Sequence, residues 1–270
     1  MSGQWIANSA KWVAEDMRGR KILDVARRGK VLFFKLSPRP FGSTQGRRGS
    51  GQAGQSERVM AIHLRMSGRL EVAKRAKDTK DAKERWMHFC WKLNGGWELR
   101  FIDPRKFGRV WYGSPAAMAA DPYLGSLGVD AKTLLPADFA VALGGYRGMV
   151  KPLLLRQDIV AGIGNILADE SLWRARIHPR SSIAALGAPV LRRLGGALQD
   201  TIRSVLASGG TSMRNFRHPD GNAGRYQDKR LVYGKAGKPC PRCHAVLRRI
   251  VVGSRGTTVC PNCQPYRILK

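Results

Sequence analysis

Four of the five cysteines lie near the C-terminus in two Cys-x-x-Cys pairs, Cys240 with Cys243 and Cys260 with Cys263. Sixteen residues separate the two pairs, a layout typical of a zinc ribbon. Each pair can direct two thiolates at one ion, and two such pairs at the tips of two hairpins complete a closed S4 site. A closed site leaves no position for a substrate. We therefore expect one structural Zn2+ that supplies folding energy to a segment too small to bury its own core.

Two disulfides or four free thiols are the alternatives to zinc. The opening sequence MSGQWIANSAKWVAEDMRGRK has no apolar stretch of the secretory kind, and Cys90 would stay unpaired in a disulfide framework. No apolar run approaches the about 20 residues that a membrane span needs. We therefore expect a zinc-binding protein of the cytoplasm, or of the nucleoid if bacterial, with no membrane partner.

Basic residues dominate the composition, with 48 Lys and Arg against 19 Asp and Glu and a net charge of +29. Residues 201–270 hold 14 of the basic residues and only 2 acidic ones, so the ribbon and the loop before it carry much of this charge. Such a charge predicts a polyanionic partner, first of all nucleic acid. An acidic membrane surface is the alternative, but no basic amphipathic helix with an aromatic apolar face stands out.

The stretch VAGIGNILADE predicts a tight glycine turn at residues 162–164, followed by a helix that starts near Asn165. A phosphate could bind the free N–H groups at the start of this helix, with the Asn165 side chain as a further donor. An ordinary helix cap explains the same residues equally well. A dinucleotide fold is excluded, because no strand precedes the turn and no acid for a ribose follows it.

The elements that must position these residues differ between the two halves of the chain. Short strands are predicted at residues 30–36 and 59–73, and a hairpin joins residues 85–93 through the turn 94–96 to residues 97–102. Residues 38–58, rich in Gly, Ser, Gln and Arg, predict a surface insertion. After residue 123 helices are expected, one starting near Pro136 and one over residues 189–208. The second helix has an apolar stripe: Val190, Leu191, Leu194, Leu198, Ile202, Val205 and Leu206.

Five motifs occur together in one order: RRGKVLFFKL, IHLRMSG, DPRKFGRV, VKPLLLRQDIVAGIGNILADESLWRARIHP, and VYGKAGKPCPRC followed by GSRGTTVCPNCQ. From about Arg18 to Gln264 the chain resembles the family of formamidopyrimidine-DNA glycosylase and endonuclease VIII. HLRMSG and DPRKFG are similar to the formamidopyrimidine branch. The resemblance implies an excision enzyme for oxidised purines, such as 8-oxoguanine and formamidopyrimidines, with abasic-site lyase activity on damaged double-stranded DNA.

The resemblance also implies the fold, an α+β multidomain chain that acts as a monomer. An N-terminal antiparallel β-sandwich, here truncated, would occupy residues 1–125, with the insertion at about 38–58. A helix-two-turn-helix domain would occupy residues 126–228, with a loop over the everted base at about 211–227. The zinc ribbon would occupy residues 229–267.

A stacked base cannot be excised, so an enzyme of this kind must evert the nucleotide and fill the gap. By resemblance Met66, Arg105 and Phe107 fill it, with Arg105 facing the orphaned base. The alternative places Met66 and Phe107 in the core and Arg105 in a turn after Asp103 and Pro104.

Phosphates around the lesion would, by resemblance, be held by Arg147, Lys151, Asn165 and Arg255. Arg255 also lies where the family uses an arginine in its second strand-breaking elimination. A further group of basic residues is expected to add only general surface charge: Arg242, Arg248 and Arg249.

The family's chemistry starts from an N-terminal proline whose amine attacks the sugar C1′, followed by a glutamate that handles the proton. This chain begins MSGQWIAN and contains no PELPEVE-like opening. Lys30 matches the family lysine that assists proton transfer in the elimination, and a surface role is its alternative. Three interpretations stay open: an active glycosylase whose coding start lies further upstream, which we favour; a damaged-DNA binder without chemistry; or a generic zinc-ribbon nucleic-acid protein.

Overall fold

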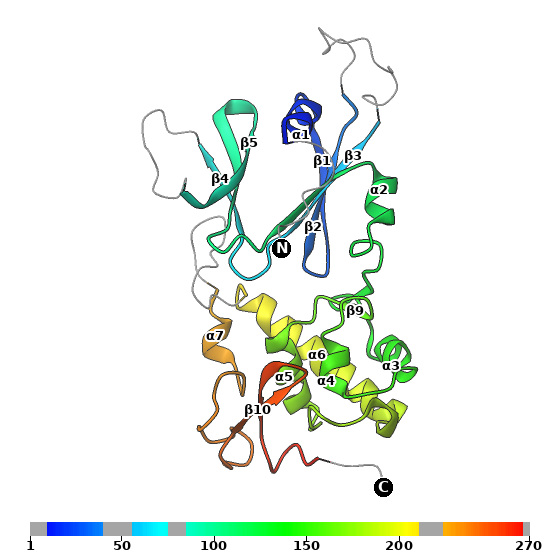
Figure 1. Ribbon diagram of the computed structural model, residues 1–270. Coiled ribbons are helices and arrows are strands. Elements are labelled where there is room, and N and C mark those ends of the chain that lie inside the picture. The colour runs from blue at the N-terminus through cyan, green and yellow to red at the C-terminus, as the bar shows by residue number, and fades with distance from the viewer. Residues whose placement is uncertain (1–9, 40–55, 75–84, 211–223, 267–270) are drawn as a thin grey trace. The chain divides into compact units, whose positions relative to one another are not determined.

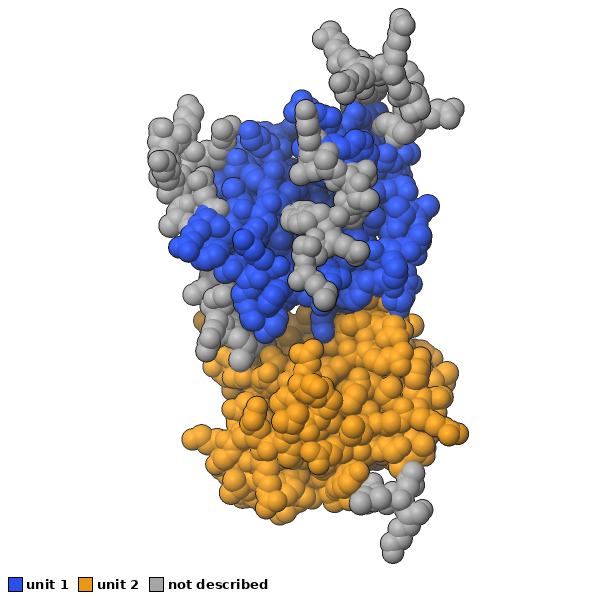
Figure 2. Space-filling model, in the orientation of Figure 1, with its two compact units in different colours: residues 1–126, 215–222 blue, residues 127–214, 223–270 orange. Residues whose placement is uncertain are grey.

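The computed structural model describes residues 10–39, 56–74, 85–210 and 224–266. Most of the expected insertion at 38–58 and of the expected loop at 211–227 therefore lies outside the described residues. Contacts between Cα atoms divide the chain into two units, shown in Figure 2. Unit 1 comprises residues 1–126 and 215–222, and unit 2 comprises residues 127–214 and 223–270.

Two antiparallel sheets form unit 1. The first has the order β1 (Ile22–Arg28), β2 (Val31–Leu36), β3 (Arg58–His63) and β7 (Arg109–Gly113). The second has β6 (Trp97–Ile102) between β4 (Arg69–Lys74) and β5 (Met87–Lys92). One buried cluster draws residues from both sheets, among them Phe34, Ile62, Leu99 and Phe101, which confirms the predicted β-sandwich.

The structure confirms the predicted strands in part. The β5–β6 hairpin has the expected turn, η2 (Asn94–Gly96), in which Gly95 and Gly96 adopt φ of +70° and +75°. The stretch 59–73 contains two strands rather than one, because the Gly68 N–H bonds back to the Leu64 carbonyl and closes a turn between β3 and β4. Strands β1 and β7 had no counterpart among the predicted elements.

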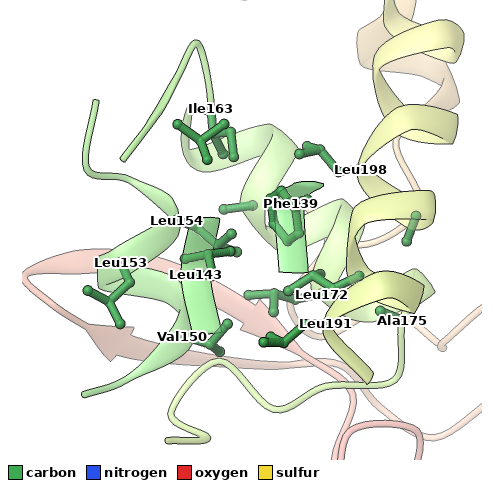
Figure 3. Packing of buried hydrophobic residues seen from close by; sticks show 14 of the residues in the cluster. Phe139, Leu143, Val150, Leu153, Leu154, Ile163, Leu172, Ala175, Leu191 and Leu198 are labelled. Carbon is green, nitrogen blue, oxygen red and sulfur yellow. The ribbon is translucent and has the colours of Figure 1, made fainter. Parts of the chain in front are cut away.

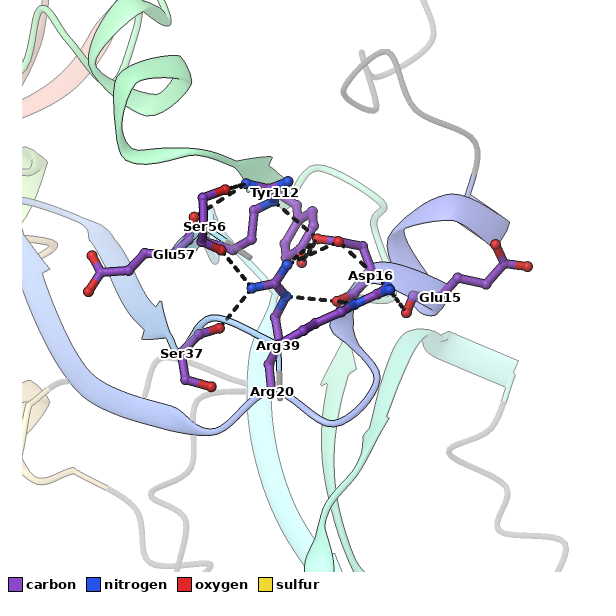
Figure 4. A network of polar contacts seen from close by, with 9 residues as sticks. Glu15, Asp16, Arg20, Ser37, Arg39, Ser56, Glu57 and Tyr112 are labelled. Atoms are coloured by element: carbon purple, nitrogen blue, oxygen red, sulfur yellow. Dashed lines mark hydrogen bonds and ion pairs between the residues drawn. The ribbon is translucent and has the colours of Figure 1, made fainter. Parts of the chain in front are cut away.

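A buried carboxylate attaches the first described helix, α1 (Ala10–Met17), to the first sheet (Figure 4). Asp16 accepts hydrogen bonds from Arg20 Nη2 at 3.0 Å, Arg58 Nε at 3.1 Å and the Tyr112 hydroxyl at 2.5 Å. Burial raises the pKa of Asp16, but the hydrogen bonds from Tyr112 and Arg20 outweigh it, so the pKa lies below its ordinary value. A short helix, α2 (Pro115–Ala120), follows β7 and is capped by the Ser114 hydroxyl.

Unit 2 is built on a helical core (Figure 3). Its main helices are α3 (Pro136–Gly144), α4 (Val150–Leu154), α5 (Asn165–Arg174) and the long α6 (Ala188–Ala207), drawn in yellow in Figure 1. The short parallel strands β8 (Val129–Asp130) and β9 (Val160–Ala161) and the turn η3 (Ile183–Ala185) connect them. Helices α3 and α5 begin where predicted, at Pro136 and Asn165.

The apolar stripe on α6 is shorter than expected. Leu191, Leu194, Leu198 and Ile202 are buried, whereas Leu206 is 56% exposed, because the core cluster ends at Ile202. Over the part of the chain that the structure describes, no helix is both long and apolar enough to cross a membrane.

The ribbon is part of unit 2 and consists of β10 (Arg248–Val252) and β11 (Arg255–Val259) with a cysteine pair on either side. Trp173 at the end of α5 packs in one cluster with Leu247, Cys240 and Cys260. The short helix α7 (Tyr226–Lys229) precedes the ribbon. The ribbon therefore belongs to unit 2 and packs against the end of α5 through a small cluster of its own.

Candidate nucleic-acid interface and metal centre

The four cysteine sulfurs predicted as zinc ligands lie within 4.8 Å of one another. Cys240 Sγ is 3.9 Å from Cys263 Sγ, and Cys243 Sγ is 3.4 Å from Cys260 Sγ. A tetrahedral zinc with four bonds of about 2.3 Å to sulfur has edges of about 3.8 Å. The donor set and its spacing therefore fit one Zn2+, as the sequence predicted.

Hydrogen-bond donors surround the sulfurs as well. The Trp173 indole N–H donates to Cys240 Sγ at 3.4 Å, and the Cys263 N–H donates to Cys260 Sγ at 3.3 Å. Burial raises the pKa of the Cys240 thiol, but the backbone N–H groups of Arg242 and Cys243 and the Trp173 indole lower it to about 6. At Cys240 these donors orient the thiolate and favour the charged form that binds a metal, whereas burial raises the pKa of the Cys260 and Cys263 thiols.

The start of α5 meets the first residues of β11. The Asn165 side chain donates to the Gly256 carbonyl at 2.9 Å, and its Oδ1 is buried without a hydrogen-bond partner. Arg255, the neighbour of Gly256, is exposed, as is Arg147 in the loop before α4. Unit 2 thus places a helix N-terminus, an amide and an exposed guanidinium beside one another, which is the chemistry of a phosphate site.

Lys151 corrects one expectation. Its side chain is fully buried, and its ammonium donates to Asp169 Oδ1 at 2.5 Å, to Thr257 Oγ1 at 2.6 Å and to the Gly256 carbonyl at 3.4 Å. All three N–H groups are therefore used inside unit 2, and the ammonium is not at the surface where a phosphate contact would need it. Asp169 Oδ2 also accepts from the Thr258 N–H at 3.0 Å, so the pair joins α4, α5 and β11.

Burial dominates the electrostatics of this pair. It lowers the pKa of Lys151 more than the Asp169 carboxylate raises it, and the charge of Arg255 lowers it further. Burial likewise raises the pKa of Asp169 more than Lys151 and the Thr258 N–H lower it.

Met66, Arg105 and Phe107 come together on two loops of unit 1, residues 64–68 and 103–108. Met66 is 75% exposed and Phe107 is 50% exposed, so neither is a core residue. Arg105 Nη1 lies 3.7 Å from Met66 Sδ, and the guanidinium carbon lies 4.8 Å from the centre of the Phe107 ring. The three side chains, which we call the wedge, form one exposed group of apolar and cationic character.

Lys30 was expected at the start of a buried strand; it is exposed in the turn between β1 and β2, after Gly29 with φ of +59° and one residue before β2 begins. It is near His63, which pairs with Val31 and Arg109 in the neighbouring strands. Burial, and then the charges of Arg65, Lys30 and Arg109, lower the pKa of His63 to about 4. This end of the sheet therefore gathers three cations around a neutral imidazole.

Sequence reasoning gave no role to several buried polar groups. Glu170 on α5 accepts from the backbone N–H groups of Leu231, Val232 and Tyr233 and so holds the segment that leads into the ribbon. Asp103 is completely buried and accepts from Ser67 and Gly108. In the sequence, only their positions within the motifs LADE (Glu170) and DPRKFG (Asp103) could have pointed to these residues.

Three family models match the chain. They describe the formamidopyrimidine-DNA glycosylase N-terminal domain at residues 2–110, its H2TH domain at residues 129–217, and a zinc finger found in FPG and IleRS at residues 237–265. The chain is also 37% identical over 246 residues to the formamidopyrimidine-DNA glycosylase of Chloroflexus aurantiacus, covering 91% of this chain and 81% of the relative. This chain belongs to the formamidopyrimidine-DNA glycosylase family. It is a DNA glycosylase of base-excision repair with one structural zinc.

Further relatives agree. The formamidopyrimidine-DNA glycosylase of Burkholderia mallei is 38% identical over 257 residues, covering 93% of this chain and 85% of the relative. A crystal structure of the MutM (Fpg) protein from Thermus thermophilus matches with a TM-score of 0.73 and 33% identity, covering 91% of this chain and 84% of that one. A complex between Lactococcus lactis Fpg and DNA containing an abasic site matches with a TM-score of 0.76 and 29% identity, covering 95% and 86%.

Proposed function

We propose that this glycosylase excises oxidised purines, 8-oxoguanine and formamidopyrimidines, from double-stranded DNA as a monomer and then cleaves the strand by abasic-site lyase chemistry. The observation that carries the proposal is the exposed wedge of Met66, Arg105 and Phe107 on two well-anchored loops. Solved relatives contain DNA with an abasic site, a Fapy-dG or a carbocyclic 8-oxo-G, which supports the same class of substrate.

The wedge fits the space that an everted nucleotide leaves. Met66 and Phe107 expose apolar surface to water at a free-energy cost, and stacking between bases removes that cost. Arg105 spans the two and offers N–H donors to the base left without its partner. Insertion of such side chains offsets the few kcal/mol of stacking that are lost on eversion.

Phosphate binding is assigned to unit 2. Arg255 and Arg147 are exposed donors, and the amide of Asn165 at the start of α5 binds the carbonyl of Gly256, the neighbour of Arg255. Lys151 takes a supporting role in this proposal, because its buried ammonium holds β11 against α4 and α5. These contacts carry no sequence information and fix the position of the duplex.

The lyase step needs an amine. Its nitrogen bonds to C1′, the bond from C1′ to the base breaks, and the base leaves with a proton. Opening of the sugar gives an imine, and loss of a proton from C2′ expels the 3′ phosphate. In the family the attacking amine is that of an N-terminal proline. Lys30 assists the proton transfer, and Arg255 supports the second elimination.

Base release from a duplex with a single 8-oxoguanine tests the proposal. For the protein with the family's N-terminal proline, we expect free 8-oxoguanine, a cut strand, and a covalent complex when borohydride reduces the imine. Lys30→Ala should slow strand cleavage more than it weakens binding, and Lys132→Ala, an exposed lysine of unit 2, serves as its control. Preferred binding to lesion duplex without base release would favour a non-catalytic damage binder, and equal binding to damaged and undamaged duplex would contradict both.

A further inference from the structure

The two wedge loops are tied to one buried carboxylate. Asp103 Oδ2 accepts the Gly108 N–H at 2.7 Å, and Oδ1 accepts the Arg105 N–H at 3.2 Å, so its side chain caps the turn that carries Arg105 and Phe107. The same Oδ1 accepts the Ser67 hydroxyl at 2.5 Å. Ser67 belongs to the other loop and directly follows Met66.

The backbone of Asp103 is fixed as well. Its N–H donates to the Trp86 carbonyl at 2.9 Å, and its carbonyl accepts from His88 Nε2 at 2.8 Å and from the Lys106 N–H at 3.2 Å. Asp103 is 0% exposed and Ser67 is 5% exposed. The link between the loops is therefore anchored to the second sheet and shielded from water.

The ring of Phe101 packs against both loops, next to Gly68 in one and Gly108 in the other. A Cβ added to Gly108 would lie 2.3 Å from Phe101 Cζ, and one added to Gly68 would lie 3.0 Å from Phe101 Cε2 and 2.4 Å from the Leu64 carbonyl oxygen. Each loop also contains one non-glycine residue in the left-handed region, Arg65 with φ of +55° and Lys106 with φ of +57°. Such strain persists only where the surroundings hold the backbone in place.

We propose that Asp103 is a positioning residue for damage recognition: through Ser67 it joins the Met66 loop to the Arg105–Phe107 loop, so that the three wedge side chains enter the DNA as one rigid body. This inference rests on the proposed function of the wedge. A preorganised wedge loses less conformational entropy on insertion than two independent loops would.

A carboxylate is the group that this position requires. Burial raises the pKa of Asp103, but the hydrogen bonds from Ser67 and from the N–H groups of Gly108, Arg105 and Phe107 outweigh it and keep the pKa below its ordinary value. An asparagine offers only one acceptor atom. If its amide nitrogen faces Ser67, the Arg105 N–H loses its acceptor, and in the other orientation the Gly108 N–H loses its acceptor.

The test compares affinity for a duplex with an abasic site and for the same duplex without damage. Phe107→Ala should reduce the ratio of the two affinities about tenfold, and Ser67→Ala and Asp103→Asn should each reduce it about threefold to tenfold. The control is Asp16→Asn, which removes another buried carboxylate of unit 1 that touches neither loop, and it should leave the ratio unchanged. A 2-aminopurine beside the gap should show less unstacking with the loop variants than with Asp16→Asn.

A double-mutant cycle separates positioning from general stability. In a Phe107→Ala background, Ser67→Ala should lower the ratio by much less than it does alone, because the wedge it positions is already incomplete. If Ser67→Ala lowers the ratio by its full amount in the Phe107→Ala background, the positioning role is overturned. It is also overturned if Ser67→Ala and Asp103→Asn leave the ratio unchanged while Phe107→Ala lowers it. Both outcomes leave the proposed function intact. No effect of Phe107→Ala would instead contradict the wedge itself. If Asp103→Asn does not fold, Ser67→Ala decides alone, since the Arg105–Phe107 turn keeps its caps.

Discussion

Asp16 in unit 1 and Asp169 in unit 2 are both buried carboxylates beside cationic side chains, and their pKa values are shifted in opposite directions. The pKa of Asp16 in unit 1 lies below its ordinary value, whereas the pKa of Asp169 in unit 2 is raised by burial. Asp16 accepts from Arg20, Arg58 and a phenol, while Asp169 accepts from one ammonium and one backbone N–H. For Asp16 the donors outweigh burial, whereas for Asp169 burial outweighs its two donors.

The difference indicates that one buried carboxylate stabilises the fold, whereas the other mainly positions neighbouring residues. A well-compensated carboxylate stabilises the fold, as Asp16 does when it joins α1 to the first sheet. An ion pair in which burial moves both partners toward neutrality contributes little net stability, and such pairs are weak evidence of a stabilising role. The Lys151–Asp169 pair binds Thr257 and Thr258 in β11, the strand that begins with Arg255. We therefore infer that the pair serves to position Arg255 relative to Asn165.

The metal centre is the strongest case of a compensated buried charge, and its loss should have the largest effect. In Cys240→Ser one of four ligands is gone, and we expect loss of zinc together with the folding free energy of order 10 kcal/mol that it supplies. DNA affinity should fall at least about tenfold, because the ribbon no longer presents its basic residues in one geometry. Elemental analysis and titration with duplex check both, with Cys90→Ser as control. A fully zinc-loaded Cys240→Ser would contradict the site.

Lys151→Met should be the next largest change. It leaves the Asp169 carboxylate buried without its cation, which costs about 3–5 kcal/mol of unfolding free energy. The double variant Lys151→Met with Asp169→Leu removes both charges and should recover most of that loss. Denaturant unfolding measures the stabilities. The salt dependence of DNA binding should differ from wild type in the single and in the double variant, because both lose the contact that positions Arg255. A double variant as unstable as the single one would show that the pair itself stabilises unit 2.

Asp16→Asn should lower the unfolding free energy by about 1–3 kcal/mol at neutral pH, because Arg20 and Arg58 lose a charged acceptor. The folded pKa of Asp16 lies below its unfolded value, so its contribution is present above the unfolded value and is lost as the pH falls through the folded one. The wild type and the variant should therefore converge well below about pH 4. Denaturant unfolding over a pH series tests this. If the difference in unfolding free energy between wild type and variant persists in acid, the effect comes from altered packing and not from the lost charge.

Arg255→Ala should have the smallest effect on affinity, because an exposed side chain contributes to DNA binding mainly through one phosphate. The slope of log affinity against log salt should decrease by about 0.9, the value for one contact. Arg248→Ala, on the neighbouring strand of the same ribbon, should weaken binding without a loss of strand cleavage. If the salt slopes of Arg255→Ala and wild type coincide, Arg255 touches no phosphate.

The sequence predicted those parts of the molecule whose signals are local. The zinc ligands follow from the spacing of four cysteines, the start of α3 from Pro136 and the start of α5 from the glycine turn before it. Strand β1 escaped prediction because all seven of its residues are exposed, so no alternation of buried and exposed positions marks it.

Burial of single polar residues depends on distant partners and could not be predicted. Lys151 is buried by residues about a hundred positions away in β11, and Asp103 is linked to Ser67 in another loop. Neither partner leaves a periodic trace in the sequence. Composition and pattern alone would place Met66 and Phe107 in the core, since apolar residues next to strands are more often buried, and only the family resemblance implied that they are exposed.

The pairing of β3 with β7 has a consequence for the order of folding. Val59 pairs with Gly113 and His63 with Arg109, so the chain between them contains the whole second sheet. Closing so long a loop costs less entropy once its interior has already condensed, and contacts distant in sequence slow folding. We therefore expect the β4–β6–β5 sheet to form before β3 and β7 join, and unit 1 to reach its native state more slowly than the helices of unit 2.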